Sequence, residues 1–545
     1  MDASPPPPDS ADTPARTSGH ADPLDMRQYR MEALPARQRS PTERWLAVAG
    51  LPLAFAAFVA FGFVWTPQWL IVADPGALSD SAASVFEQVG SEEFLRRNRF
   101  MLAVFVAAII LWTTVALPNY LVSLIVIITL VLTGVLPERE AYAQLGHPIM
   151  WLNIMSFILA SMLVKTGLAT RFTLWFLVRF GKRASSVFLS FIVINVTLSA
   201  FISATTAKAA ILLPVFMVIA AIYGAPRDGS HSNFGRSVVL QNLLNINLGA
   251  GCFVTGSGAN LLAAALISGA IAGNVYFADW MIAMFPTMVG LMLLGYILAM
   301  RVYFPLDENE RTPQIEGGLE RLREEYAALG PVAWSEVRAG AIFIAILALW
   351  ATDRWHGVSA TAVAFVGGIV ALLPRVGIVT WNDVDIPWHL MLFSAGAYCL
   401  GAAFAQTGMP NLGVSAFFNA VGFDEQTPFW VLYLLLTAVM TYSALLSQSK
   451  TMRAMIFVPI AIGTAEHFGH SVISLALPVA FLIEHVYVLP FNSKPAALLF
   501  ETDRYSLGDA FRYGFTMMTL GWLAVIVMGE TWFRFLGITP DGVFF

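Results

Sequence analysis

Two short polar clusters stand inside otherwise apolar sequence, and their side chains could bind a small ion. The first is Ser203-Ala204-Thr205-Thr206, followed by Lys208, and the second is Ser447-Gln448-Ser449-Lys450-Thr451. Such a cluster interrupts a membrane helix, and unwound backbone is tolerated there only where it is buried in protein or lines a water-filled cavity. Helix N-termini favour anions, whereas released carbonyl oxygens favour cations. We therefore interpret each cluster as part of a ligand site, although a lone Ser/Thr cluster could simply bond back into its own helix.

Each half of the chain also has a second polar segment, broken by glycine or proline. The first is 251–260 and the second is 489–495. Backbone can approach a ligand closely at such loops. Four polar segments in two matched pairs could therefore surround one site. The substrate-binding candidates are Ser203, Thr205, Thr206, Lys208, Ser257, Asn260, Ser449, Lys450, Thr451, Asn492, Ser493 and Lys494.

Four basic residues lie in or beside these segments: Lys208, Lys450, Arg453 and Lys494. A charge at the bilayer centre costs at least about 2.5–3.5 kcal/mol, so it normally faces a partner or a cavity, or else extends to the interface. A fixed ammonium attracts a carboxylate or sulfate. It also repels Na⁺, by about 4 kcal/mol at 4 Å and an effective dielectric near 20. The pattern predicts a site for a small anion.

The pair Glu484-His485 lies in an apolar stretch and could relay protons, since histidine titrates near neutrality. An equally good interpretation makes Glu484 the counter-ion of Lys450 or Lys494, with His485 a packed residue. A coupling ion would be Na⁺ or H⁺, and we expect no cofactor and no metal centre. The ion-coupling candidates are Ser199, Ser203, Thr255, Ser447, Gln448, Glu484 and His485.

The polar clusters belong to a pattern that occurs twice. Its landmarks are Pro148, Thr166-Gly167 and Pro214 in the first copy, and Pro387, Thr407-Gly408 and Pro459 in the second. Secondary transporters build their sites from such repeats, with broken helices meeting at the bilayer midplane. We therefore predict an all-α polytopic membrane protein made of two inverted repeats. The elements expected are re-entrant hairpins at 148–180 and 388–421 and broken helices at 186–222 and 428–466.

Composition supports a membrane protein, with 57% apolar residues, 12% charged residues and a mean hydropathy of +0.68. These values exclude an ordinary soluble enzyme. Charged residues concentrate in 1–44, read as a disordered cytoplasmic tail, and in 301–338, read as an amphipathic linker. The linker separates membrane halves at 45–300 and 339–545. A net charge of −5 does not suggest nucleic acid as a partner. The partners that we expect are the lipid bilayer and a small anion. No intramembrane protease motif is present, so we expect no enzyme activity.

From about residue 100 to the C-terminus the chain resembles the divalent anion:sodium symporter family of the ion transporter superfamily. The resemblance rests on Gly146–Trp151 leading to Lys165-Thr166-Gly167, on the linker segment 324–331, on the clusters before Pro214 and Pro459, and on the loops near Asn260 and Pro495. It implies about eleven membrane helices with two re-entrant hairpins. It also implies a homodimer, elevator-type movement of a transport domain past a scaffold, and di- or tricarboxylates or sulfate as substrates. We expect an integral, multi-pass protein of the plasma or inner membrane, with the linker on the cytoplasmic side.

The chain departs from the family at its Ser-Asn-Thr signatures. Counting back ten residues from the prolines gives Ala204-Thr205-Thr206 and Ser449-Lys450-Thr451, whereas the register of Phe201-Ile202-Ser203 gives Ser203-Ala204-Thr205 for the first. Neither asparagine is present, and a lysine takes one of the two places. The family's Thr-Pro-Pro-Asn loops read Ser257-Gly258-Ala259-Asn260 and Ser493-Lys494-Pro495-Ala496.

Our hypothesis is that Lys450, with Lys494, stands where a sodium ion sits in the symporters. This predicts an anion transporter that works by sodium-independent exchange or by proton coupling. Sodium-coupled anion symport is one alternative. Cation:proton antiport, known from the same superfamily, is the other, although such sites usually carry acids rather than bases.

Overall fold

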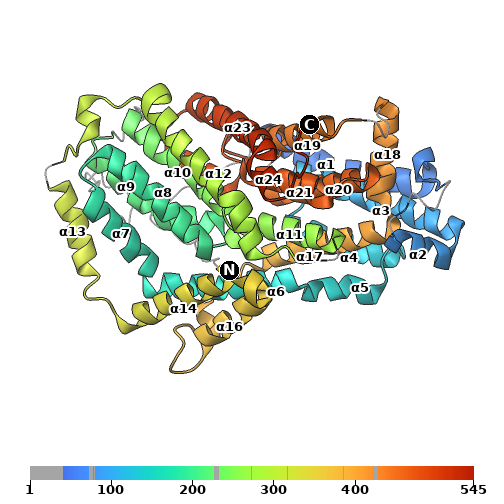
Figure 1. Cartoon of the computed structure of the whole chain (residues 1–545), viewed down its shortest axis with the longest axis horizontal. Helices are drawn as coiled ribbons and strands as arrows, with labels where there is room; N and C mark the ends of the chain where they lie inside the picture. Colours follow the sequence, from blue (N-terminus) through green and yellow to red (C-terminus); the bar gives the residue numbers. More distant parts are fainter. Residues whose placement is uncertain are drawn as a thin grey trace, which may run out of the picture.

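The computed structural model describes residues 41–72, 78, 80–225, 232–271, 273–315, 317–384, 386–422, 427–447 and 449–544, which fold into helices without a β-strand (Figure 1). The predicted tail lies outside these residues, except for 41–44 at the start of the first helix. The helices before the linker are α1 (Pro41–Val59), α2 (Asp80–Val89), α3 (Ser91–Thr114), α4 (Asn119–Leu132), α5 (Glu138–Ala143), α6 (Pro148–Thr166), α7 (Leu168–Phe180), α8 (Ala184–Phe201), α9 (Thr205–Ile222), α10 (Asn233–Gly251), α11 (Gly258–Ala270) and α12 (Phe277–Leu298).

The linker contains α13 (Gly318–Ala328), which buries Leu322 and leaves most of its charged residues exposed. The helices after it are α14 (Trp334–Ala351), α15 (Asp353–His356), α16 (Ala360–Leu372), α17 (Trp388–Thr407), α18 (Met409–Val421), α19 (Phe429–Tyr442), α20 (Lys450–His467), α21 (Val472–Phe481), α22 (Lys494–Phe500), α23 (Leu507–Glu530) and α24 (Trp532–Phe535).

Within the described residues, eight helical segments are long and apolar enough to cross a bilayer. They are Arg44–Val64, Glu138–Thr166, Ala184–Phe201, Thr205–Ile222, Phe277–Tyr303, Trp334–Ala351, Trp388–Thr407 and Leu507–Phe535. Shorter apolar helices add to these, among them α4, α11 and α16. The prediction of an all-α, multi-pass integral membrane protein is confirmed.

The segments that we expected to be single broken helices, 186–222 and 428–466, are helical hairpins. The rings of Phe191 on α8 and Phe216 on α9 lie 5.6 Å apart, and the Tyr223 hydroxyl donates to the carbonyl of Gly181 at 2.8 Å. Residues 25 positions apart on one continuous helix would be separated by about 37 Å, because each residue adds about 1.5 Å. The chain therefore reverses at residues 202–204. In the second half, the rings of Phe429 and His470 lie 4.9 Å apart at the open end of α19 and α20.

The segments that we expected to be hairpins, 148–180 and 388–421, are bends instead. Gly167 and Gly408 have φ of 70° and 60°, a conformation that ends a helix and that glycine adopts without strain. Beyond the bend, α7 turns away from α6 to pack against α8 and α13, and α18 turns away from α17 to pack against α20 (Figure 1). The Thr-Gly pair thus ends one helix without fixing the direction of the next.

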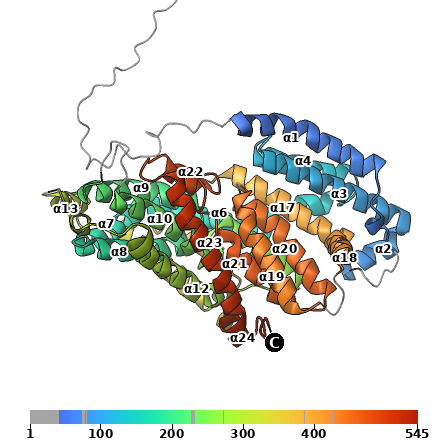
Figure 2. The ribbon, with the colours of Figure 1, turned by 90° about the horizontal axis from the view of Figure 1, so that it is seen from above.

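An interrupted helix follows each hairpin. In the first half it comprises α10, a 3₁₀ turn η7 (Val254–Gly256) and α11; in the second it comprises α21, a 3₁₀ turn η12 (Leu482–Glu484), a loop and α22. The helix α10 is buried on all sides and packs against both α8 and α9, just as α21 packs against both α19 and α20. Figure 2 shows the α8–α9 hairpin on one side of α23 and the α19–α20 hairpin on the other. This repeated arrangement positions the polar clusters.

Candidate functional site

The second arms of the two hairpins begin at equivalent residues. The N-cap of α9 is Ala204 and that of α20 is Ser449, and each lies ten residues before the proline inside its helix. This match selects one of the two registers considered for the first cluster, the one that pairs Ala204-Thr205-Thr206 with Ser449-Lys450-Thr451. Thr205 and Lys450 are then the first residues of their helices.

A single ion pair links these two helix starts to the loops. The ammonium of Lys450 lies 2.7 Å from Glu484 Oε2 and 3.4 Å from the hydroxyl of Thr205. The other carboxylate oxygen, Oε1, accepts a hydrogen bond from Ser257, the N-cap of α11. Thr205 and Ser257 come from the first half of the chain, and Lys450 and Glu484 from the second. Both repeats therefore contribute to one polar cluster.

Burial and charge suit this cluster to an anion. Glu484 exposes 1% of its side chain, whereas Lys450 exposes 15% and so can be reached. The helices α9, α11 and α20 begin here, and the N-terminus of a helix carries a partial positive charge. The cluster already contains one carboxylate, held by an ammonium and a hydroxyl. The same groups could hold a carboxylate of a bound molecule.

The two loop serines are also equivalent, because Ser257 caps α11 and Ser493 caps α22. The amide nitrogen of Asn260 donates to the carbonyls of Ala250 and Phe253, and that of Asn492 donates to the carbonyls of Ala444 and Ser447. These two asparagines, predicted to bind substrate, therefore hold the loops in place.

The two bases that follow the clusters are buried elsewhere. Lys208 is fully buried and donates to Ser199, an ion-coupling candidate, rather than to an acid. Arg453, which we noted among the bases but did not include among the site residues, is buried on α20 in a similar setting. Its spacing was visible in the sequence, since Lys208 and Arg453 both lie six residues before the proline of their helix.

The remaining candidates lie outside the ion-pair cluster. Lys494 is exposed at the start of α22, and our hypothesis that it stands with Lys450 in the place of a sodium ion stays a prediction. His485 is fully buried with its ring against Gly521 of α23, where an added Cβ would lie 2.1 Å from Nε2. No hydrogen bond joins it to Glu484 in the described structure. The other positions are as follows: Ser203 and Thr255 are buried, Thr206 and Thr451 are half-buried, Ser447 bonds to Ser449, and Gln448 lies outside the described residues.

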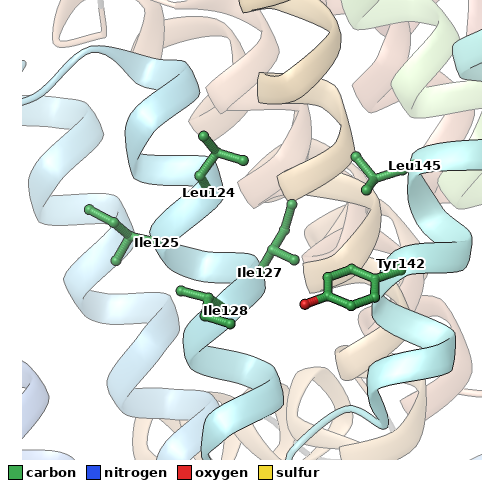
Figure 3. A pocket seen from close by; sticks show the side chains of 6 residues that line it. All are labelled: Leu124, Ile125, Ile127, Ile128, Tyr142 and Leu145. Carbon is green, nitrogen blue, oxygen red and sulfur yellow. The ribbon is translucent and has the colours of Figure 1, made fainter.

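A hollow of about 400 Å³ on the surface lies between α4 and the segment containing α5 (Figure 3). Its lining is Leu124, Ile125, Ile127, Ile128, Tyr142 and Leu145. These side chains are hydrocarbon apart from one phenol, so the hollow offers no charged group to an anion. Among the described residues, no three His, Cys, Asp or Glu side chains are grouped so that they could hold a metal ion.

Comparison with known proteins places this geometry in context. Residues 92–539 match the family described as the sodium:sulfate symporter transmembrane region. A membrane protein of Cupriavidus necator is 23% identical over 80% of this chain and 87% of its own length. The sodium-dependent dicarboxylate transporter SdcS of Staphylococcus saprophyticus is 25% identical over 78% and 85%, and the chloroplastic dicarboxylate transporter 1 of Arabidopsis thaliana is 26% identical over 82% and 80%.

Proposed function

Because the chain belongs to the family of the sodium:sulfate symporter transmembrane region, we propose that it carries small dianions, dicarboxylates above all, across a membrane. The observation that carries the proposal is the Lys450 cluster. Lys450 is partly exposed at the meeting point of both repeats, and it already holds a carboxylate in a site formed by three helix N-termini. Relatives named as dicarboxylate transporters support the same substrate class.

The balance of buried charge favours a dianion. Among the described residues at and beside the hairpin tips, three bases stand against the carboxylate of Glu484: Lys208, Lys450 and Arg453. With each group in its usual ionised form the excess is two positive charges, which a dicarboxylate would neutralise. Since net charge is costly inside a bilayer, the loaded site should cross more readily than the empty one. This difference favours exchange of one anion for another.

Our proposal includes transport without sodium, by exchange or with proton coupling, and elevator-type movement of the hairpins and interrupted helices as one unit in a homodimer. Sodium-coupled symport is the competing mechanism, because a relative is named as sodium-dependent. The excess of bases over acids at the hairpins argues against the third candidate, cation:proton antiport.

The test is uptake of labelled succinate into proteoliposomes that contain the full-length protein, with sodium or choline outside. Vesicles preloaded with unlabelled succinate should take up label equally fast in both salts, and vesicles without internal dicarboxylate should not. Uptake that instead follows a pH gradient into empty vesicles would identify proton coupling. A steep and strict requirement for sodium would overturn the sodium-independent mechanism.

Two lysines provide a matched pair of variants for this assay. Lys450→Met removes the ammonium of the cluster, whereas Lys494→Met removes an exposed ammonium on α22. We expect the first to abolish uptake and the second to leave most of it. Full succinate exchange by the Lys450 variant would rule out the proposed site.

A further inference from the structure

Two buried bases outside the Lys450 cluster occupy equivalent positions in the two repeats. Lys208 on α9 lies six residues before Pro214, and Arg453 on α20 lies six residues before Pro459. Their exposed fractions are 0% and 1%. A buried cation normally pairs with a carboxylate, but these two donate to hydroxyl and main-chain carbonyl oxygens instead.

Lys208 joins the first hairpin to the first interrupted helix. Its ammonium donates to the hydroxyl of Ser199 on α8 at 2.6 Å and to the carbonyl of Ile246 on α10 at 3.3 Å. The hydroxyl of Ser199 is oriented in turn by the carbonyl of Asn195, at 2.7 Å. The ammonium thus connects both arms of the hairpin with the helix that lies against them.

Arg453 makes the same connections in the second repeat. Its guanidinium donates to the hydroxyl of Ser443 at 3.1 Å and to the carbonyl of Met440, both at the end of the first arm. It also donates to the carbonyls of Leu482 and Ile483, at 3.4 and 3.3 Å, in the turn where the second helix is interrupted. In both repeats the cationic group donates to a hydroxyl of the first arm and to main-chain carbonyl oxygen of the interrupted helix, which is one carbonyl within α10 for Lys208 and two in η12 for Arg453.

Hydroxyl and carbonyl oxygens are the ligands that a hard cation takes from a protein, and unwound helix ends offer them to sodium in transporters. We propose that Lys208 and Arg453 are built-in cations. Each occupies the group of hydroxyl and carbonyl oxygens in its own repeat, its oxygen cage, and so holds the hairpin to the interrupted helix. A cage filled in this way has no room for an alkali-metal ion. Lys450 differs from both, because its partners are a carboxylate and a hydroxyl.

The inference concerns how the hairpins are held, and it stands whether or not Lys450 binds the transported anion. It assigns the role of standing in for a metal ion to Lys208 and Arg453, whereas our hypothesis from the sequence assigned that role to Lys450 and Lys494. It also predicts that removing either base leaves a set of oxygens that a sodium ion could occupy.

The experiment uses purified full-length protein and the variants Lys208→Ser and Arg453→Ser, with Lys208→Arg and Arg453→Lys as charge-retaining controls. Thermal unfolding is measured in sodium chloride and in choline chloride at equal ionic strength, together with binding of ²²Na⁺. We expect the wild type and the charge-retaining variants to show neither sodium-specific stabilisation nor ²²Na⁺ binding. Each serine variant should show both, which a merely structural role of the base would not produce.

Each outcome decides the matter. Saturable ²²Na⁺ binding by the wild type, or serine variants without a sodium-specific response, would overturn the inference. If a serine variant aggregates in choline chloride, recovery of monodisperse protein only in sodium chloride supports the inference, and aggregation in both salts counts against it. Failure of succinate exchange by the wild type would reject the proposed function and leave the binding result intact.

Discussion

Glu484→Gln tests whether the buried carboxylate competes with the transported anion for Lys450. The substitution keeps the shape of the side chain and the acceptor for Ser257, but it removes the charge that lies 2.7 Å from the ammonium. Two unit charges at 4 Å attract each other by about 4 kcal/mol at an effective dielectric near 20. An incoming carboxylate must displace this partner, so a neutral residue should make binding easier.

The same substitution should lower stability. Removing one partner of a buried ion pair typically costs about 3–5 kcal/mol. Because Lys450 keeps 15% exposure, we expect the lower end, about 3 kcal/mol. If at least 1.4 kcal/mol of the lost attraction becomes available to the ligand, succinate should bind about tenfold more tightly, or better. Exchange should slow, since tighter binding delays release.

Calorimetric titration of succinate and thermal unfolding measure the two effects separately. Glu466→Gln is the control, because Glu466 lies exposed on α20 and its removal should change neither quantity. Weaker succinate binding by Glu484→Gln would refute the competition and make Glu484 a residue that orients Lys450 for the ligand. An unchanged melting temperature would refute the stabilisation that we assign to the ion pair between Lys450 and Glu484.

Three further predictions follow from the same structure. Gly256→Ala should destabilise the protein by about 1–3 kcal/mol in thermal unfolding, because its Cβ would lie 2.2 Å from a carbonyl oxygen, whereas Gly258→Ala, with nothing within 4 Å, should not. Lys165 pairs with Asp383 and lowers the pKa of that carboxyl to about 2, so the contribution of the pair is lost only as pH falls through that value. The difference in stability between the wild type and Asp383→Asn should therefore stay constant between about pH 5 and pH 8 and be small, because the pair is exposed. Lys450→Asn should abolish succinate binding in sodium chloride and in choline chloride alike. Succinate binding that requires sodium would instead favour our hypothesis that Lys450 stands in the place of a sodium ion.

The duplicated landmarks predicted much of the fold, because polar residues inside apolar sequence have few places to go in a bilayer. The sequence matched Ser449-Lys450-Thr451 with the first cluster, but it placed both clusters in broken helices rather than at the tips of hairpins. What the pattern could not give was the direction of the chain after each break. A Thr-Gly pair and a Ser/Thr cluster both end a helix, and only tertiary contacts such as that of Phe191 with Phe216 decide which one reverses.

The site was predicted in the same uneven way. The pairing of Lys450 with Glu484 was one of two interpretations of the sequence, and the structure contains it. Lys494 was placed in the site because it occupies a family position, but the first residue of a short helix can direct its side chain to either side, and here that side chain is exposed. Equal spacing from the prolines was the signal that would have paired Lys208 with Arg453.

The three cations Lys208, Arg453 and Lys450 have different partners, and these partners indicate different roles. Withdrawing Lys208 or Arg453 from its oxygen cage would leave buried carbonyls and hydroxyls without a donor, at about 1–3 kcal/mol for each group, so these two bases are fixed. Lys450 can exchange the carboxylate of Glu484 for that of a ligand and keep an equivalent bond throughout. Such an exchange loses little interaction energy at any step. A transported anion must be bound and then released, and of the three cations Lys450 is the one whose surroundings allow both.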